Sequence, residues 1–544
     1  MAQSPDREPD SGATTIDEAG ASRWPQWLRR SIRNPTYVDR AAVAIDTRSL
    51  AAFRIGLACL IFGDLIARSR NFHFFYTEDG VVPQSMAESM TADNAFSMFF
   101  YTTDTTAIAG LFVLQAIVAG LLLVGYRTRL STILAFVLVV SLDHHNPLVL
   151  SYADTLFRLL LFWAIFLPLG DRWSIDAAHA RRSPRTAVAS LASAAILIQI
   201  VYMYFVNGYH KRESDLWTSG EATPLIMGLD NTTFLFGEFT RNFPTLLQYG
   251  GLGWYYMLLF SPLLILLRGK ARLALLLAFV GGHASFALTV RIGAFPYVAL
   301  TGLVLFVQTP IWDRATRAIA SRSARPAPAT RSLQQFARAI PNPRLLGGYV
   351  ERTRSGLLTI AVAIAVVSLL VLPALSLAPV AGFVDDEGGP KERADEHATT
   401  FRIAQPDWSV FAPHPRTVDR YYVFAAETET GDRIDVYHDR PLTADRPEGS
   451  LQAQFGTYRE RFYMNSVRRG GPNDVVPETL AEHLCETWEG DQGESLTHVN
   501  MYYVVEQVTL ETLDDHDERA SEVRSIYAHG CGDNEPTQIS LEDG

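Results

Sequence analysis

The sequence predicts a polytopic α-helical membrane protein of about nine spans with a C-terminal extracytoplasmic α+β domain. Three observations predict this fold class: long apolar runs, basic residues confined to alternate loops, and an acidic C-terminal part in which apolar and polar residues alternate. We take each apolar run as one span of a hydrocarbon core about 30 Å thick, although several runs are short or carry a charge. The runs lie near residues 50–67, 105–125, 131–142, 155–169, 187–207, 252–267, 272–290, 294–309 and 356–380.

The orientation follows from the distribution of lysine and arginine. Basic residues precede the first span and follow the second, fourth and sixth spans, and nine arginines lie in the segment 313–355. The opposite loops have few basic residues, so the positive-inside rule places the N-terminus in the cytoplasm and the C-terminus outside. We expect a disordered tail and an interfacial helix over 1–45, and a basic cytoplasmic loop over 313–355.

Residues 386–544 are predicted to form the acidic extracytoplasmic domain. From residue 381 to the C-terminus the chain has 34 acidic and 14 basic residues, a balance of −20, against −11 for the whole chain. This balance argues against nucleic acid as a partner. Alternation around Glu429-Thr430-Gly431-Asp432 predicts a hairpin. The expected strands are 421–428, 433–438, 501–510 and 524–529, and the expected helix is 478–488.

The cysteines of this domain predict a crosslink rather than a metal site. Cys485 and Cys531 share one small domain, so we expect them to be close enough to bond in an oxidising compartment. No histidine and cysteine cluster has the spacing of a zinc site, so no metal is expected.

Lys211 is the most informative residue of the chain. It ends the apolar stretch Ile198–Lys211, where an amine must be paired, reach the surface, or be kept neutral by desolvation. A neutral amine is a base, which predicts chemistry within the membrane. The alternative is an interfacial anchor whose ammonium points to water, and Trp217 indicates that the chain stays near the interface.

Three histidines are further candidates. His144 and His145 follow Asp143 at the outer end of a predicted span, and a pair at such a position is expected to form a polar cap exposed to water. His283 lies between small residues at membrane depth, where an imidazole must be hydrogen-bonded. That bond serves either catalysis or helix-to-helix contact.

Other charged residues lie within spans or close to their ends. Asp154 and Arg158 are four residues apart, so on a helix they face the same side and are expected to neutralise one another. Charges within lipid are costly and usually line an interior cavity, so together these groups predict a polar cavity in the bundle.

Four stretches, in their order and spacing, resemble a known family over roughly residues 45–310. They are Arg54-Ile55-Gly56-Leu57 with Asp64; Gly125-Tyr126-Arg127 through Asp143-His144-His145-Asn146-Pro147 to Trp173-Ser174-Ile175-Asp176; Val201-Tyr202 to Gly208-Tyr209-His210-Lys211 with Asp215-Leu216-Trp217; and His283-Ala284-Ser285-Phe286 with Ile292-Gly293-Ala294-Phe295-Pro296-Tyr297. They resemble the horizontally transferred transmembrane domain family, whose best-known enzymes are vitamin K-dependent γ-glutamyl carboxylases. The resemblance implies a carboxylase-like transmembrane domain over 46–312, followed by a final span at 356–380.

The start of the C-terminal domain resembles that of bacterial and archaeal members of the family, on the segment Gln405–Pro413. Within it, Trp408 and Phe411 either dock the domain onto the membrane body or simply pack. Simple packing is the more common role of an aromatic and proline turn, and we favour it.

The resemblance implies a quinol-dependent, lyase-type carboxylation. Lys211 would deprotonate a reduced quinone of the vitamin K type, and His283 matches a histidine that the carboxylases carry. Substrate-binding candidates are His144, His145, Asp154, Arg158 and Trp217. Expected partners are the lipid bilayer and a secreted peptide substrate, and a lipid substrate is also open. The alternative function is a non-catalytic membrane factor for export or maturation of a secreted peptide.

Overall fold

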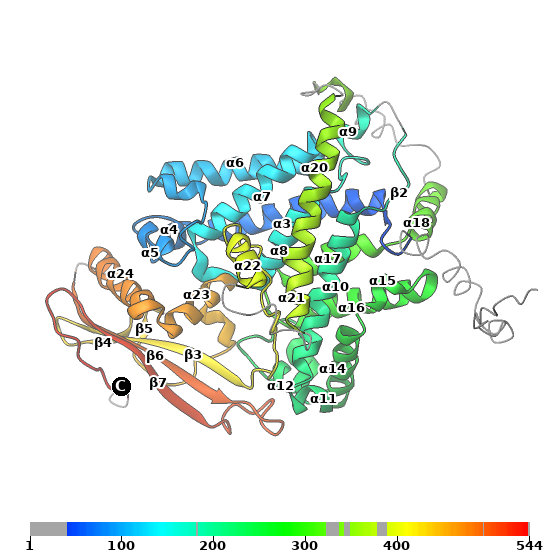
Figure 1. The fold of residues 1–544 in the computed structure, drawn as a ribbon. Helices are drawn as coiled ribbons and strands as arrows, with labels where there is room; N and C mark the ends of the chain where they lie inside the picture. The colour runs from blue at the N-terminus through cyan, green and yellow to red at the C-terminus, as the bar shows by residue number, and fades with distance from the viewer. Residues whose placement is uncertain are drawn as a thin grey trace, which may run out of the picture.

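The structure is a computed structural model that describes residues 41–180, 183–322, 337–341, 349–377, 389–492 and 494–541. Over these residues a helical part is followed by a part built on a β-sheet (Figure 1). Residues 1–40, which hold most of the predicted tail and interfacial helix, lie outside the described residues, as does much of the predicted loop 313–355. The helices of the first part are α3 (Thr47–Ser69), α4 (Phe72–Tyr76), α5 (Gln84–Ser89), α6 (Thr105–Val124), α7 (Thr128–His145), α8 (Tyr152–Ala164), α9 (Ile175–Ala178), α10 (Leu191–Lys211), α11 (Asp215–Ser219), α12 (Ala222–Met227), α13 (Gly237–Arg241), α14 (Pro244–Leu259), α15 (Leu263–Leu266), α16 (Gly269–Thr289), α17 (Phe295–Leu303), α18 (Thr309–Arg322), α20 (Tyr349–Val366) and α21 (Leu372–Leu375).

Five helical segments in the described residues are long and apolar enough to cross a membrane. They are Thr47–Ser69, Thr105–Val124, Leu191–Lys211, Gly269–Thr289 and Gly356–Leu375. A sixth candidate is a broken span of Phe295–Phe306 and Thr309–Ala318, which meet at 98°. These six candidates overlap six of the predicted runs, so the chain is a mostly helical membrane protein with five or six candidate spans in its described part.

The other three predicted runs form helices that are shorter or more polar at one end. With 13 and 16 residues, α8 and α14 reach roughly 20 and 24 Å at 1.5 Å per residue. Helix α7 has 18 residues but ends in Asp143, His144 and His145. Local sequence sets the start of α8, because Ser151 and Asp154 form a capping box there.

The C-terminal part is a five-stranded antiparallel sheet in the order β5-β4-β3-β6-β7, with α23 and α24 over the face turned toward the helical part (Figure 1). The predicted hairpin is confirmed, because β3 and β4 pair with Ala426 opposite Ile434. The other predicted strands overlap β6 and β7, and the predicted helix lies within α24. The elements are α22 (Pro390–Thr399), β3 (Val418–Thr428), β4 (Arg433–Asp435), β5 (Arg440–Pro441), α23 (Tyr458–Arg469), α24 (Val475–Gln492), β6 (Leu496–Gln507) and β7 (Ser521–Gly530).

The expected crosslink is present in this part. Cys485 of α24 and Cys531, directly after β7, form a disulfide with their Cα atoms 5.9 Å apart. Because β7 is an edge strand, the bond fixes the edge of the sheet to the helix that covers it.

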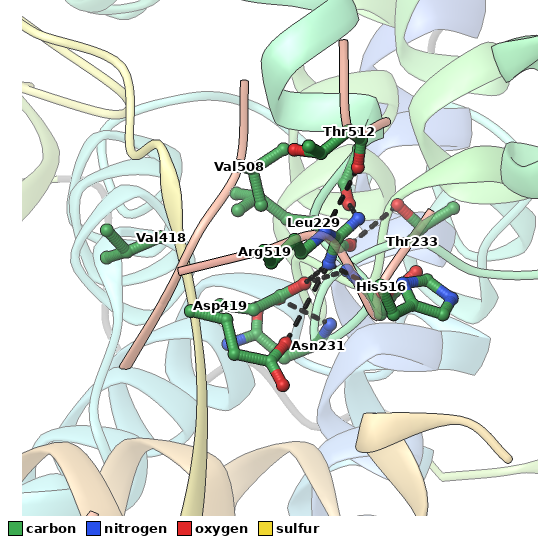
Figure 2. Close-up of polar contacts among 12 residues, drawn as sticks. Leu229, Asn231, Thr233, Val418, Asp419, Val508, Thr512, His516 and Arg519 are labelled. Atoms are coloured by element: carbon green, nitrogen blue, oxygen red, sulfur yellow. Dashed lines mark hydrogen bonds and ion pairs between the residues drawn. The ribbon is translucent and has the colours of Figure 1, made fainter. Parts of the chain in front are cut away.

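A buried charge cluster joins the C-terminal part to the loop after α12 (Figure 2). Arg519, whose side chain is fully buried, lies 3.0 Å from Asp230 of that loop and 3.0 Å from Asp419 of β3, and it donates to the Gly228 carbonyl. Asp419 also accepts the backbone N–H groups of Asp230 and Asn231. The Arg519 guanidinium and the Asp419 carboxylate each bond to both the helical part and the C-terminal part, and together they hold the sheet on the helices.

Candidate functional site

A cavity of about 580 Å³ lies among α10, α12, α14, α16 and the segment that leads into the sheet. Tyr204, Asn207 and Lys211 of α10 line it, and their spacing of three and four residues places them on one face of that helix. His283 of α16 lines the same space. Most other lining side chains are apolar or aromatic, so the cavity has the composition of a small-molecule site with a few polar groups.

Lys211 is buried, with 2% of its surface exposed. Its Nζ donates to the carbonyls of Val410 at 2.8 Å and Phe411 at 3.0 Å, and lies 3.6 Å from the centroid of the Trp217 ring. No carboxylate in the described part of the chain forms an ion pair with it. An interfacial anchor would point its ammonium at water, whereas this amine points into the protein.

The carbonyls of residues 408–411 are held by side chains of the helical part. Asn207 Nδ2 donates to the carbonyls of Trp408 at 2.7 Å and Val410 at 3.0 Å, and Trp217 Nε1 donates to that of Phe411 at 2.8 Å. Trp408 and Phe411 have φ values of 49° and 50°, which non-glycine residues rarely adopt. The preferred interpretation of simple packing is therefore wrong, because this bent segment docks the C-terminal part onto the membrane helices.

His283 is fully buried and bridges two helices. Its Nε2 lies 2.7 Å from the Tyr204 hydroxyl of α10, so the expected hydrogen bond is present. Its Nδ1 is buried and has no hydrogen-bond partner among the described residues. A buried polar atom without a partner costs about 1–3 kcal/mol, so this nitrogen marks a position where a bound hydroxyl group would be stabilised.

Trp254 of α14 forms an aromatic wall beside His283. The two rings meet edge to face with centroids 5.4 Å apart. Gly282 makes this approach possible, because a Cβ there would lie 2.5 Å from the Trp254 ring. The absence of a side chain at Gly282 thus lets the indole of Trp254 lie against the imidazole.

His144 and His145 lie outside this cavity and are buried, so the expected water-exposed polar cap is wrong. Arg402 donates to His144 Nδ1 at 3.0 Å, and His144 Nε2 lies 3.1 Å from the Thr400 carbonyl. Because Arg can only donate, Nδ1 accepts and the Nε2 proton goes to the carbonyl, which describes a neutral imidazole with both nitrogens satisfied. His145 stacks on Phe99 at 5.0 Å. His144 thus links α7 to the segment that leads into the sheet, and His145 packs within the helical part.

Asp154 and Arg158 do not pair with one another as expected. Arg158 pairs with Asp143, and Asp154 lies 2.9 Å from Arg459 of α23. The reason is local, because Asp154 caps the start of its own helix and its carboxylate is directed to that end. Arg459 also pairs with Asp64, so this buried network is a second joint between the two parts of the chain.

The structure therefore brings together three of the predicted site residues, Lys211, His283 and Trp217. It adds Tyr204 and Asn207, for which the sequence held a usable signal in their helical spacing from Lys211. The carbonyls of residues 408–411 had no such signal, because backbone groups are common to every residue.

Residues 43–312 match the family model of the HTTM domain. Comparison with curated proteins found no match, and comparison with solved structures found none. The match includes every helix that lines the cavity and leaves residues 408–411 outside it. Residues 43–312 thus form an HTTM domain, the domain found in vitamin K-dependent γ-carboxylases and related membrane proteins.

Proposed function

We propose that this protein is a γ-carboxylase-like membrane enzyme that modifies a peptide or lipid substrate at the outer membrane face in a quinol-dependent reaction. The observation that carries the proposal is the buried Lys211 amine, which shares an apolar cavity with His283 and has no carboxylate partner in the described chain. The HTTM domain supports the reaction class.

The residues of the cavity fit a reduced quinone. A volume of about 580 Å³ lies within the usual range of small-molecule sites. Trp254 and Phe286 provide aromatic walls for a flat ring, and Lys211 and the unpartnered Nδ1 of His283 provide groups for its hydroxyls. A reduced quinone bound there supplies oxygen-dependent chemistry that generates a strong base.

A lipid-soluble ligand has a route from the bilayer to this cavity. Phe239 of α13, Phe243 directly before α14 and Leu246 of α14 line the cavity and are also exposed on the protein surface. Exposed apolar side chains at the end of membrane helices face lipid. The ligand would therefore enter between these side chains without crossing water.

The chain's own residues would handle the proton. Lys211 Nζ takes a proton from a bound hydroxyl, and the Val410 and Phe411 carbonyls hold the resulting ammonium in place. His283, oriented by Tyr204 through Nε2, uses Nδ1 to position the ligand. Residues 408–411 exclude water from this side of the cavity.

For the topology we propose nine spans, a cytoplasmic N-terminus, a transmembrane domain over 46–312, a final span at 356–380 and an extracytoplasmic domain over 386–544. The disulfide between Cys485 and Cys531 supports the outer location, since such bonds persist in oxidising compartments. A reporter fused after Asp543 tests this. Activity of a reporter that works only in the cytoplasm would contradict it.

One observation favours the second candidate, a non-catalytic factor for export or maturation of a secreted peptide. Lys211, Asn207 and Trp217 all donate to carbonyls of residues 408–411, so they form a clamp on the C-terminal part without any chemistry. In this function the C-terminal domain would bind the peptide.

Lys211→Arg separates the two candidates, because arginine keeps donors and charge but is not deprotonated near neutral pH. Secreted proteins are analysed by mass spectrometry for a carbon dioxide mass gain, with and without this protein. If the protein is an enzyme, the unaltered protein produces the carbon dioxide mass gain. The control variant Arg212→Gln, which changes an exposed neighbour, also produces it, and Lys211→Arg does not. No gain from the unaltered protein, with normal secretion in Lys211→Arg, would establish the non-catalytic function. Deleting 386–544 is unsuitable because it removes a wall of the cavity.

A further inference from the structure

Five arginines gather where the C-terminal part meets the loop between α16 and α17. They are Arg291 of that loop, Arg416 and Arg420 at the start of β3, and Arg461 and Arg468 of α23. None of the five forms an ion pair with a carboxylate in the described residues. The nearby carboxylates have other partners. The chain from residue 381 to the C-terminus has a charge balance of −20, so this group of arginines is a local reversal of charge.

A pocket of about 320 Å³ lies at one end of this row, on the face of the sheet beside α23. Arg420 of β3, Tyr503 of β6 and Arg524 of β7 line it from adjacent strands, and Arg468 lines it from α23. Its one acidic residue, Glu522, lies 2.6 Å from Arg524 and is already paired. Three arginines against one glutamate give the lining a charge of +2.

Among the described residues, Arg420 and Arg468 form no hydrogen bond and no ion pair with a carboxylate. The Nε atom of each is buried and lacks a hydrogen-bond partner. Arg468 lies over the Tyr503 ring, 5.7 Å from its centroid. Burial and the neighbouring Arg468 lower the pKa of Arg420, and burial with Arg461 and Arg420 lowers that of Arg416 to about 9. The fold thus holds cations together at a cost in stability.

We infer that this arginine pocket, lined by Arg420, Arg468 and Tyr503, binds an oxyanion group of a ligand, either a carboxylate or a phosphate. A guanidinium presents a planar fork of donors that matches both groups, and the guanidinium groups of Arg420 and Arg468, which line the pocket, form no hydrogen bond to the described residues. The ring of Tyr503 supplies a flat apolar surface for the body of the ligand. The site does not depend on chemistry at Lys211, so it goes beyond the proposed function.

The row of arginines also connects this pocket with the membrane cavity. Arg461 donates to the Arg291 carbonyl at 3.1 Å, and Arg291 lies between Val290 and Ile292, which line the cavity. Positive side chains therefore extend from the sheet to the cavity wall. An anionic group bound in the arginine pocket would be held on the side of the sheet that leads to the cavity.

A structural role and a binding role predict opposite effects on stability. If the two arginines held the fold together, replacing them would lower the thermal midpoint. If they are kept for a ligand, removing two partly buried, mutually repelling charges leaves the midpoint of the ligand-free protein unchanged or raises it. The double variant Arg420→Gln/Arg468→Gln measures this. Arg469→Gln is the matched control, because it removes an equal charge from an exposed neighbour.

The test uses the full chain in detergent at low salt, with calorimetric titration of inorganic phosphate in one arm and glutarate in the other. We expect at least one anion to bind and to raise the thermal midpoint. Affinity should fall roughly tenfold or more in the double variant and stay within about twofold in Arg469→Gln. Binding of only one anion identifies the group as phosphate or carboxylate. Absence of binding in both arms, an equal loss in the control, or a lower midpoint of the anion-free double variant would overturn the inference.

Discussion

Adding one methyl group to Gly282 should disturb the candidate site, whereas adding it to Gly281 should not. A Cβ at Gly282 would lie 2.5 Å from Cζ3 and 2.9 Å from Cε3 of Trp254, while a Cβ at Gly281 meets nothing within 4 Å. Trp254 must then move away from His283, whose ring it contacts edge to face. The two glycines are adjacent on α16, so they form a matched pair.

The expected difference between the variants follows from two opposing contributions. Alanine in place of glycine within a helix stabilises by about 0.5–1 kcal/mol, and both variants share this gain. Overpacking costs about 1–3 kcal/mol, and only Gly282→Ala incurs it. Gly281→Ala should therefore be slightly more stable than the unaltered protein. Gly282→Ala should be less stable than Gly281→Ala by about 1–3 kcal/mol.

The free energy of unfolding can be measured by denaturant titration of the detergent-solubilised protein, with tryptophan fluorescence as the signal. Quinone binding by each variant is measured in parallel, because displaced Trp254 should weaken it only in Gly282→Ala. Equal stabilities of the two variants, within about 0.5 kcal/mol, would show that Trp254 does not lie against Gly282 and would refute the described cavity wall.

Three further predictions concern the joints and the C-terminal part. Arg459→Met leaves two partly buried aspartates with one cation fewer, so denaturant titration should show a loss of about 3 kcal/mol. No loss of stability would contradict this ion-pair network. Replacing Cys485 and Cys531 by serine removes a crosslink between residues 46 positions apart and should lower the free energy of unfolding by roughly 4 kcal/mol. The thermal midpoint of this variant should therefore be lower than that of the oxidised protein. An unchanged midpoint would argue against the bond. Burial lowers the pKa of His483 below its ordinary value of 6.5. Just below pH 6.5 the unfolded chain therefore binds a proton at this residue that the folded protein does not bind. The free energy of unfolding should fall as the pH drops through about 6.5. The midpoint of His483→Gln should change less between about pH 7.5 and about pH 5.5, and an identical pH profile would argue against a pKa of His483 lowered by partial burial.

Periodicity and residue type predicted those features that depend on neighbours in sequence. The hairpin at Gly431 and the apolar helices follow from local pattern, and Lys211 and His283 were each candidates from the sequence. That the two line one cavity is known only from the structure. The pairing of Asp154 could not be predicted in this way. Its helical neighbour Arg158 is the nearest cation in sequence, but its partner Arg459 is 305 residues away. Only the folded arrangement brings that cation closer.

The burial of His144 and His145 escaped prediction for a related reason. A polar run at the end of an apolar segment usually meets water. Here Thr400 and Arg402 of the C-terminal part cover His144, and Tyr76 and Phe99 of the helical part cover His145. The same part supplies the carbonyls that hold Lys211. Surfaces that are formed by a later segment of the chain carry no signal in the earlier segment.

The clamp on Lys211 has a consequence for the order of events during synthesis. The carbonyls that hold its amine belong to residues 199 and 200 positions further along the chain. At about 5–20 residues per second, the membrane helices exist for roughly 10 s or longer before this wall can be placed. Until then the amine is hydrated and the cavity is open on one side. A nascent or truncated chain therefore lacks a finished site, and closure of the cavity occurs only in a protein whose C-terminal part has been made and docked.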